Sequence, residues 1–280
     1  ARYPQARAVF DRYGLQGCGG LGGPVESVGF FSRSHGVPAD RLLKEIHEAI
    51  GRDHGAEDAA AAAPTIADTI YRRFFTAGIA CILTAGAAWG ALLLWKIGIA
   101  GTFTGAASIF EINAHGHAQI FGWVGLFIMG FAYQAFPRMW HTPLAAPRLA
   151  GLAFAMMLVG LTARTVSMAL AETWSAAVPV TIAGGVLEVV AITVFVGQLL
   201  MTFYRSDAKF EPYVAFAVAA LSLFVLQAVG ELWHTVNTMT ASSRDELLWY
   251  VATYQAPLRD LQIHGLAMLM ILGVSIRMVP

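Results

Sequence analysis

Long apolar runs occupy most of the chain from about residue 69 onward, and short polar stretches separate them. Each run is long enough to cross the roughly 30 Å hydrocarbon layer of a bilayer as a helix of ~20 residues. The runs cover about 73–98, 108–137, 147–170, 175–204, 211–239 and 259–280. The pattern predicts an all-α fold, a polytopic transmembrane helical bundle with about six helices over residues 69–280. Because the sixth run reaches Pro280 without a polar tail, we expect the bundle to continue beyond this chain.

Residues 1–52 follow a different pattern, because they are polar and contain glycine-rich turns. Within "PADRLLKEIHEAIG" the apolar residues recur at helical spacing, and Asp40 is the expected N-cap of this helix. Its apolar face consists of Leu42, Leu43, Ile46 and Ile50. Residues 53–68 are rich in alanine and charge and have no core pattern. We therefore expect a small soluble helical domain over 1–52, joined by a linker over 53–68 to the membrane bundle.

A further amphipathic segment, "SSRDELLWYVATYQAP", separates the fifth and sixth runs. Trp249 and Tyr250 are typical of the belt where a membrane meets water. The segment predicts a short helix lying along the membrane interface.

Lysine and arginine in the short loops predict the orientation of the bundle. We call side A the face at which the first run begins, and side B the opposite face. Side A collects Arg72, Arg73, Arg138, Arg148, Arg205, Lys209 and Arg277, whereas side B has mainly Lys96, Arg244 and Arg259. The excess of positive charge predicts that side A is cytoplasmic, and we expect the domain over 1–52 on that side.

Composition excludes several other classes of protein. The chain is 57% hydrophobic and only 13% charged, about half the charged fraction of a soluble domain. Its formal net charge is zero, so nothing indicates a nucleic-acid partner. Two cysteines, Cys18 and Cys81, are too few for a disulfide framework or a four-thiolate metal site.

Histidines carry the strongest chemical signal. Four of them belong to three different runs and lie towards side B at a similar depth: His115, His117, His234 and His264. Strongly polar side chains inside a bilayer are costly and usually face the interior of a bundle. Neutral imidazole can coordinate heme iron or copper without adding a charge. The four residues are therefore candidate metal or heme ligands.

The spacing of the histidines limits how they can act. His115 and His117 are two residues apart, so on a regular helix they point about 200° away from each other. They cannot both ligate one metal from a straight helix. A bis-histidine heme would need either of them together with His234 or His264 on another helix.

Three charged residues inside the runs are further candidates. Arg164 is a candidate partner for a heme propionate, or it extends to the side B interface. Glu188 is a candidate for a proton relay or for a pairing role with a neighbouring helix. Glu231 precedes His234 by three residues, so it shares a helix face with that histidine and could orient it.

Two segments resemble a known family. Residues 113–139, "NAHGHAQIFGWVGLFIMGFAYQAFPRM", and residues 256–280, "APLRDLQIHGLAMLMILGVSIRMVP", share His-Gly-x-Ala near their starts, a weak internal repeat. The first resembles a helix of the NnrS family, and also helices of the catalytic subunits of heme-copper oxidases and nitric oxide reductases. The second resembles the NnrS segment with a histidine, a mid-helix glycine and a terminal arginine. The likeness covers most of residues 73–280.

The resemblance implies a function. NnrS proteins are bacterial inner-membrane proteins that contain heme and copper and are tied to nitric oxide metabolism. It implies a b-type heme, with copper as a second candidate cofactor, and a role in nitric oxide response or respiratory electron transfer. By the same resemblance His115, His117 and His264 are the ligands. Gln119 stands where the family has an acidic residue, which leaves an oxidase- or reductase-like catalytic subunit open, and a non-redox proton-coupled transporter is the other alternative.

The front of the chain is similar to a second family. "RYGLQGCGG" followed by "HGVPADRLL" resembles the small helical domain of iron-sulfur repair proteins of the ScdA type. Those proteins have a cysteine pair where this chain has Cys18 alone. Both resemblances imply nitrosative stress, with respiratory or denitrification proteins as partners, nitric oxide or oxygen as a small ligand, and a homo-oligomer as a further expectation. Whether the chain is an oxidoreductase stays open at this point.

Overall fold

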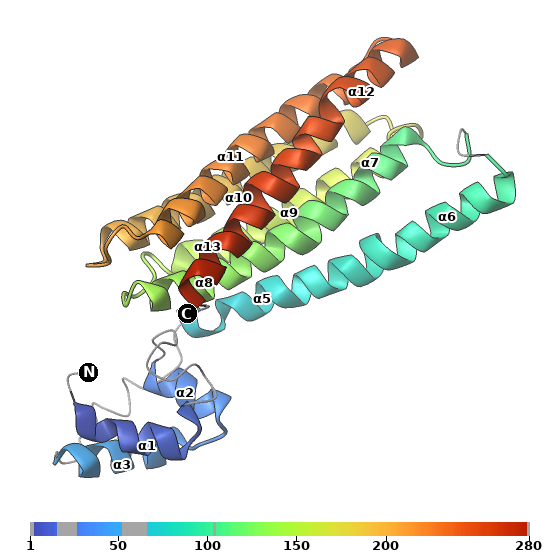
Figure 1. Ribbon diagram of the computed structural model, residues 1–280. Coiled ribbons are helices and arrows are strands. Elements are labelled where there is room, and N and C mark those ends of the chain that lie inside the picture. Colours follow the sequence, from blue (N-terminus) through green and yellow to red (C-terminus); the bar gives the residue numbers. More distant parts are fainter. Residues whose placement is uncertain (1–2, 16–26, 52–65, 103–104, 279–280) are drawn as a thin grey trace.

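The computed structural model describes residues 3–15, 27–51, 66–102 and 105–278. Within these ranges the secondary structure is helical and contains no strand, so the predicted all-α fold is confirmed (Figure 1). Cys18 and most of the expected linker, residues 53–65, lie outside the described ranges.

A small helical cluster precedes the membrane bundle. It consists of η1 (Pro4–Ala6), α1 (Arg7–Arg12), α2 (Val28–Ser34) and α3 (Ala39–Ile50). Its core contains Val9, Phe31, Leu42 and Ile46, which includes two residues of the predicted apolar face. The N-cap of α3 is Pro38 rather than the predicted Asp40, which lies in the first turn, where a carboxylate interacts favourably with the helix dipole. Gly51 ends the helix with φ +70°, a left-handed conformation that glycine adopts without strain.

Six helical spans are long and apolar enough to cross a membrane in the described part of the chain. They are Thr69–Ala100, Ile109–Met139, Arg148–Ala169, Ala177–Tyr204, Pro212–Met239 and Arg244–Arg277. The chain is therefore a membrane protein whose surrounding solvent is a lipid bilayer. We call these the first to sixth spans.

The third, fourth and fifth spans are the single helices α9 (Arg148–Ala169), α10 (Ala177–Tyr204) and α11 (Pro212–Met239). Two glycines bring α9 and α10 into backbone contact. A Cβ on Gly160 would lie 2.7 Å from the carbonyl oxygen of Gly184, and a Cβ on Gly184 would lie 2.7 Å from the backbone nitrogen of Arg164. Small residues permit this approach between membrane helices. The contact holds Arg164 against the next turn of α10, which contains Glu188.

The other three spans each contain a π-helical segment, a widened turn that often occurs at functional sites. The first span is α5 (Ile66–Cys81), η4 (Ile82–Ala88) and α6 (Trp89–Ala100). The second is α7 (Ile109–His117), η5 (Ala118–Gly125) and α8 (Leu126–Met139). The sixth is α12 (Arg244–Asp260), η6 (Leu261–Met268) and α13 (Leu269–Met278). Figure 1 shows the first and sixth spans at the outside of the bundle.

The predicted interfacial helix is wrong in one respect. Its residues form α12, which runs through Pro257 without a break into η6 and the sixth span. Trp233 of α11 packs its ring against Tyr254 of α12, with centroids 4.9 Å apart. Gln255, a polar residue of the predicted interface segment, instead donates to Asn113 of the second span at 2.7 Å.

Candidate functional site

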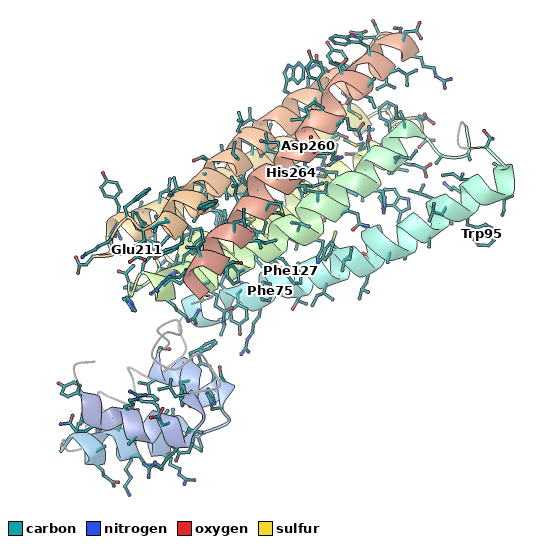
Figure 2. All side chains as sticks on the ribbon, viewed as in Figure 1. Phe75, Trp95, Phe127, Glu211, Asp260 and His264 are labelled. Carbon is teal, nitrogen blue, oxygen red and sulfur yellow. The ribbon has the colours of Figure 1, made fainter. Side chains whose placement is uncertain are left out.

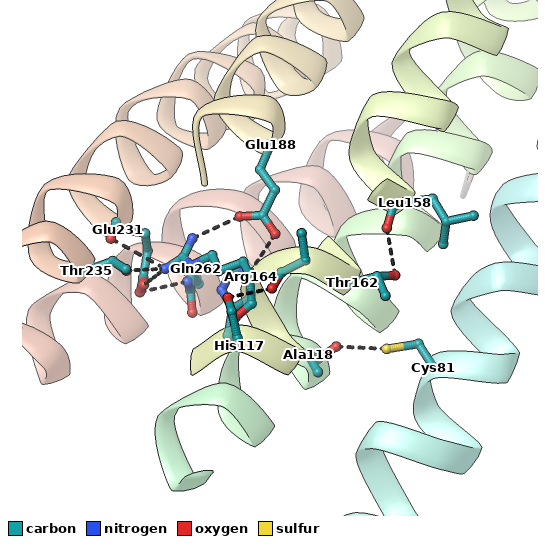
Figure 3. A network of polar contacts seen from close by, with 12 residues as sticks. Cys81, His117, Ala118, Leu158, Thr162, Arg164, Glu188, Glu231, Thr235 and Gln262 are labelled. Carbon is teal, nitrogen blue, oxygen red and sulfur yellow. Dashed lines mark hydrogen bonds and ion pairs between the residues drawn. The ribbon is translucent and has the colours of Figure 1, made fainter. Parts of the chain in front are cut away.

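Arg164 is the centre of a buried ionic network in the side B half of the bundle (Figure 3). Its guanidinium is 2% exposed and lies between two carboxylates. Nη1 donates to Glu188 Oε2 of α10 at 2.9 Å, and Nη2 donates to Glu231 Oε2 of α11 at 3.2 Å. Nη2 also donates to the hydroxyl of Thr235, one turn after Glu231. The residue expected to bind a heme propionate or to extend to the interface thus has two carboxylates of the protein as partners.

His117 joins the network from the end of α7. Its Nε2 lies 2.7 Å from Glu188 Oε1, so one carboxylate contacts the imidazole and the guanidinium through different oxygens. Because Arg164 favours the ionised carboxylate, we assign the proton of this hydrogen bond to His117 Nε2. The lone pair is then on Nδ1, which is buried and has no hydrogen-bond partner among the described residues.

The sixth span completes the network through Glu231. Glu231 Oε1 accepts a hydrogen bond from Gln262 Nε2 at 3.2 Å and lies 3.7 Å from Arg259 Nη1. Arg259 in turn donates to Gln262 Oε1 at 3.0 Å. Two guanidinium groups therefore face two carboxylates, and their formal charges cancel.

His234 lies on the same helix as Glu231, one turn closer to side B. It is buried, and its Nε2 has no hydrogen-bond partner in the described ranges. A narrow polar pocket connects it with the network, and this pocket has space for about one water molecule. The pocket is lined by Asn113, His117, Arg164, Met168, Glu231, His234, Thr235, Thr238, Gln255 and Arg259. Gln255 donates to Asn113 at 2.7 Å and links α12 with α7 beside it.

His115 faces away from this pocket, as its spacing from His117 predicts. Its Nδ1 lies 2.8 Å from the carbonyl oxygen of Ala85 in the first span. Since a carbonyl only accepts, Nδ1 carries the proton. The ring packs on Gly90, where a Cβ would lie 3.0 Å from its Cε1 atom. The two neighbouring histidines therefore contact different spans.

His264 lies on the outer surface of the sixth span. Its side chain is 69% exposed, and Nδ1 is 3.4 Å from Asp260 Oδ1 on the same helix (Figure 2). The structure thus brings His117, Arg164, Glu188, Glu231 and His234 together around one network and pocket. It does not bring His115 or His264 to that place.

Three members of the network were not singled out from the sequence: Thr235, Arg259 and Gln262. Thr235 is four residues after Glu231, a spacing that could have placed it on the same helix face. The two residues of the sixth span were assigned to the side B interface or left unassigned. Among the described residues, no group of three or more His, Cys, Asp or Glu side chains is arranged to hold a metal ion.

No family model matches the chain, and neither the curated proteins nor the solved structures contain a match to it. A function for this chain is therefore inferred from the chemistry of the buried network.

Proposed function

We propose that this chain is a membrane protein that takes up a proton from side B at the His117–Glu188 pair and uses it in a proton-coupled process, either transport or respiratory electron transfer. The observation that supports this proposal is the buried hydrogen-bonded network of His117, Glu188, Arg164 and Glu231 between apolar spans. Ionisable residues at such depth mark proton and substrate pathways in membrane proteins.

Stability alone is a poor reason for such a network. Burial removes water from each charge at a cost that the mutual attraction rarely exceeds, and apolar replacements of similar volume are often neutral or stabilising. Apolar side chains would also be compatible with the surrounding spans. A role in moving charge explains why four ionisable groups are assembled here.

The contacts of His117 support a direction for the proposed proton movement. In the assigned tautomer the unpartnered Nδ1 of His117 can accept a proton, and Nε2, which lies 2.7 Å from Glu188 Oε1, can donate one. An imidazole that accepts a proton on Nδ1 can release the proton on Nε2 to the carboxylate, which leaves the neutral ring in its other tautomer. Arg164 stabilises the ionised carboxylate of Glu188, which is the form that can accept this proton. A water molecule in the pocket could carry protons from the vicinity of His234 to His117.

Infrared difference spectra between acidic and alkaline pH test this proposal, because they resolve the C=O stretch of a protonated carboxyl group. We expect the purified protein in vesicles to show such a band and Glu188→Gln to remove it. Glu111→Gln is the matched control, since Glu111 pairs with Lys96 outside the network at 2.8 Å. An unchanged band in Glu188→Gln would refute the proposal.

A metal ion in the same pocket is a second candidate function, and one observation favours it. His117 Nδ1 and His234 Nε2 are buried imidazole nitrogens without partners, and both residues line one pocket together with the thioether of Met168. A carboxylate on the other nitrogen of His117 is the usual arrangement for a metal-bound histidine. Imidazole and thioether ligands favour copper in the reduced state, which agrees with the NnrS-like resemblance and a role in nitric oxide response.

Elemental analysis separates this candidate from the first. If the pocket binds copper, we expect roughly one copper per chain. The copper should be lost in both His117→Ala and His234→Ala and retained in His264→Ala. Equal metal content in all three variants would exclude the pocket as a copper site.

Of the bis-histidine pairs that the spacing left open, His117 with His264 does not fit this arrangement. One side chain is enclosed beside a pocket of about one water, and the other faces outward from the sixth span. His117 and His234 line one pocket and stay open as a pair, so heme remains a prediction. An optical spectrum of the purified protein, with and without dithionite and nitric oxide, tests it.

Side A is proposed to be the cytoplasmic face of a bacterial inner membrane. The excess of arginine at that side supports this orientation. The guanidinium of Arg138, at the side A end of the second span, lies 4.4 Å from the ring of Phe30 in the N-terminal cluster. The cluster therefore contacts the bundle at side A. Reporter fusions test the orientation: we expect a reporter after residue 206 to be cytoplasmic and one after residue 102 to be periplasmic, and the reverse result would contradict it.

A further inference from the structure

A second cavity lies outside the ionic network, between the sixth span and the first two. It is an apolar groove with a volume of about 450 Å³, within the size range of ligand pockets. Its lining includes four aromatic side chains, namely Phe75, Trp123, Phe127 and Phe131. The sixth span contributes Ala267, Met270, Ile271, Val274 and Ser275. We call this cavity the lipid groove.

The chemistry of the lining favours a hydrocarbon chain as its occupant. Ser275 is the only side chain in the lining with a hydroxyl or other strong hydrogen-bonding group apart from the indole of Trp123, so a polar head group would find few partners inside. A further helix is a poor match, because helix-packing faces in membranes favour small residues and this wall is built of large rings. A flexible acyl chain can follow such a surface.

Positive charge at one end of the groove favours an occupant that also has an anionic head group. Arg72 precedes Phe75 by three residues, and Arg277 follows Val274 by three, so each arginine shares a helix face with a residue of the groove. Both positions are exposed, and Figure 1 shows the start of α5 and the end of α13 at the same end of the bundle. Neither arginine forms an ion pair with a carboxylate of the described residues; Arg277 lies 5.8 Å from the ring of Tyr213. Basic pockets between helices bind anionic lipid head groups.

We propose that the lipid groove binds an anionic phospholipid, with an acyl chain against Trp123 and Phe127 and the phosphate between Arg72 and Arg277 at side A. The aromatic wall positions the chain: Phe75 and Phe127 stack at 4.8 Å and form one continuous surface. This site is separate from the His117–Glu188 pair, and its occupancy does not depend on the proposed proton uptake.

Fluorescence quenching tests the proposal with the full chain in nanodiscs. The probes are phosphatidylglycerol and phosphatidylcholine that carry the same brominated acyl chains, and Trp123→Phe identifies the share of the signal that comes from Trp123. We expect brominated phosphatidylglycerol to quench that share at lower mole fractions than brominated phosphatidylcholine. Arg72→Gln and Arg277→Gln should each weaken this preference about fivefold. Arg205→Gln, at the side A end of α10 and away from the groove, should leave it unchanged.

A groove-filling variant examines the acyl chain independently of the head group. Ala267→Phe should lower quenching of Trp123 by both lipids, with the helical circular dichroism of the original chain as the test that it folds. Equal quenching by the two lipids in the unmodified chain would overturn the anionic preference. Protection of Trp123 from both lipids would show that protein fills the groove, and it would overturn the proposal as a whole.

Discussion

Towards side B, the interior of the bundle holds four ionisable side chains in contact, whereas towards side A the same helices enclose aromatic and aliphatic groups. Glu188 of α10 belongs to the first set, and Phe195, two turns further along α10, belongs to the second. The part of the side A set nearest to Glu188 is an aromatic layer formed by Phe121, Phe195 and Phe224, with ring centroids 6.2 Å (Phe121–Phe224) and 6.4 Å (Phe195–Phe224) apart.

The side A half also contains buried polar groups, and they differ in kind. Gln198 donates to the carbonyl oxygens of Ala145 and Ala146, and Thr202 accepts from the backbone nitrogen of Ala145. These neutral groups bind the loop between α8 and α9 to α10 through hydrogen bonds. The comparison teaches that Glu188 has different neighbours in its two directions: the polar side chains of His117 and Arg164 lie towards side B, and the aromatic layer lies towards side A.

The largest expected effect tests the charged half. Arg164→Met leaves two buried carboxylates without their shared cation, and we expect a loss of about 3–5 kcal/mol in the free energy of unfolding. Detergent titration followed by circular dichroism measures it. Arg205→Met at the exposed end of α10 is the control. Similar losses in both variants would contradict a central role for Arg164.

The next effect tests the close contact that positions the network. Gly160→Ala places a methyl group 2.7 Å from a backbone oxygen of α10, and overpacking of this kind costs about 1–3 kcal/mol. Gly151→Ala on the same helix meets nothing within 4 Å and should be neutral or stabilising. The same titration distinguishes the two. If both variants were equally stable, the helices would not depend on backbone contact.

The third prediction compares a histidine inside the bundle with a histidine on its surface. His117→Leu removes a hydrogen bond from Glu188 and should cost about 1–3 kcal/mol, because a buried carboxylate oxygen is left without a partner. His264→Leu should change stability by less than about 0.5 kcal/mol, since its side chain is exposed. Thermal unfolding in detergent compares them. A larger loss of stability in His264→Leu than in His117→Leu would contradict this prediction.

A neutral substitution in the side A half should have a smaller effect. Gln198→Leu removes hydrogen bonds to two loop carbonyls, with an expected cost of about 1 kcal/mol. Amide hydrogen exchange of residues 144–146 should rise at the same time, whereas exchange near Glu188 should not. Increased exchange at both places would mean that the two halves are coupled more tightly than the contacts indicate.

The smallest effect concerns the N-terminal cluster and pH. The hydroxyl of Tyr13 donates to Glu45 and holds the pKa of that carboxyl below its ordinary value of 4.5, with Arg41 and Arg12 acting in the same direction. Because the folded pKa is lowered, the contribution to stability is present above pH 4.5 and is lost as pH falls through the lowered pKa. Tyr13→Phe should raise the pKa of Glu45 in an NMR titration of the full chain. An unchanged titration would show that the arginines alone set it.

Much of the fold could be predicted because membrane spans are encoded in the length of apolar runs. The exception was the segment over 242–257, whose polar residues predicted a helix along the membrane interface. In the structure this segment belongs to α12 and is part of the sixth span, and its Gln255 donates to Asn113 of the second span. Hydropathy alone does not distinguish a polar side chain that meets water from one that meets another helix.

Several residues of the candidate site could be predicted from the sequence, but the contacts between them could be predicted less well. Depth along each helix placed Arg164, Glu188 and Glu231 within the apolar spans, but which carboxylate meets which cation depends on the rotation of α9, α10 and α11 about their axes. The direction of His264 was harder still, because the π-helical segment η6 changes the angular spacing of its side chains from that of an α-helix.

The position of Glu188 near the middle of α10 has an electrical consequence. A proton that moves from side B to this carboxylate carries its charge across about half of the hydrocarbon layer, so the membrane potential does work on that step. A full crossing is worth about 2.3 kcal/mol per 100 mV, and half of it is about 1 kcal/mol. In the proposed proton uptake, the occupancy of Glu188 therefore depends on voltage as well as on pH, and side B positive relative to side A favours the protonated form.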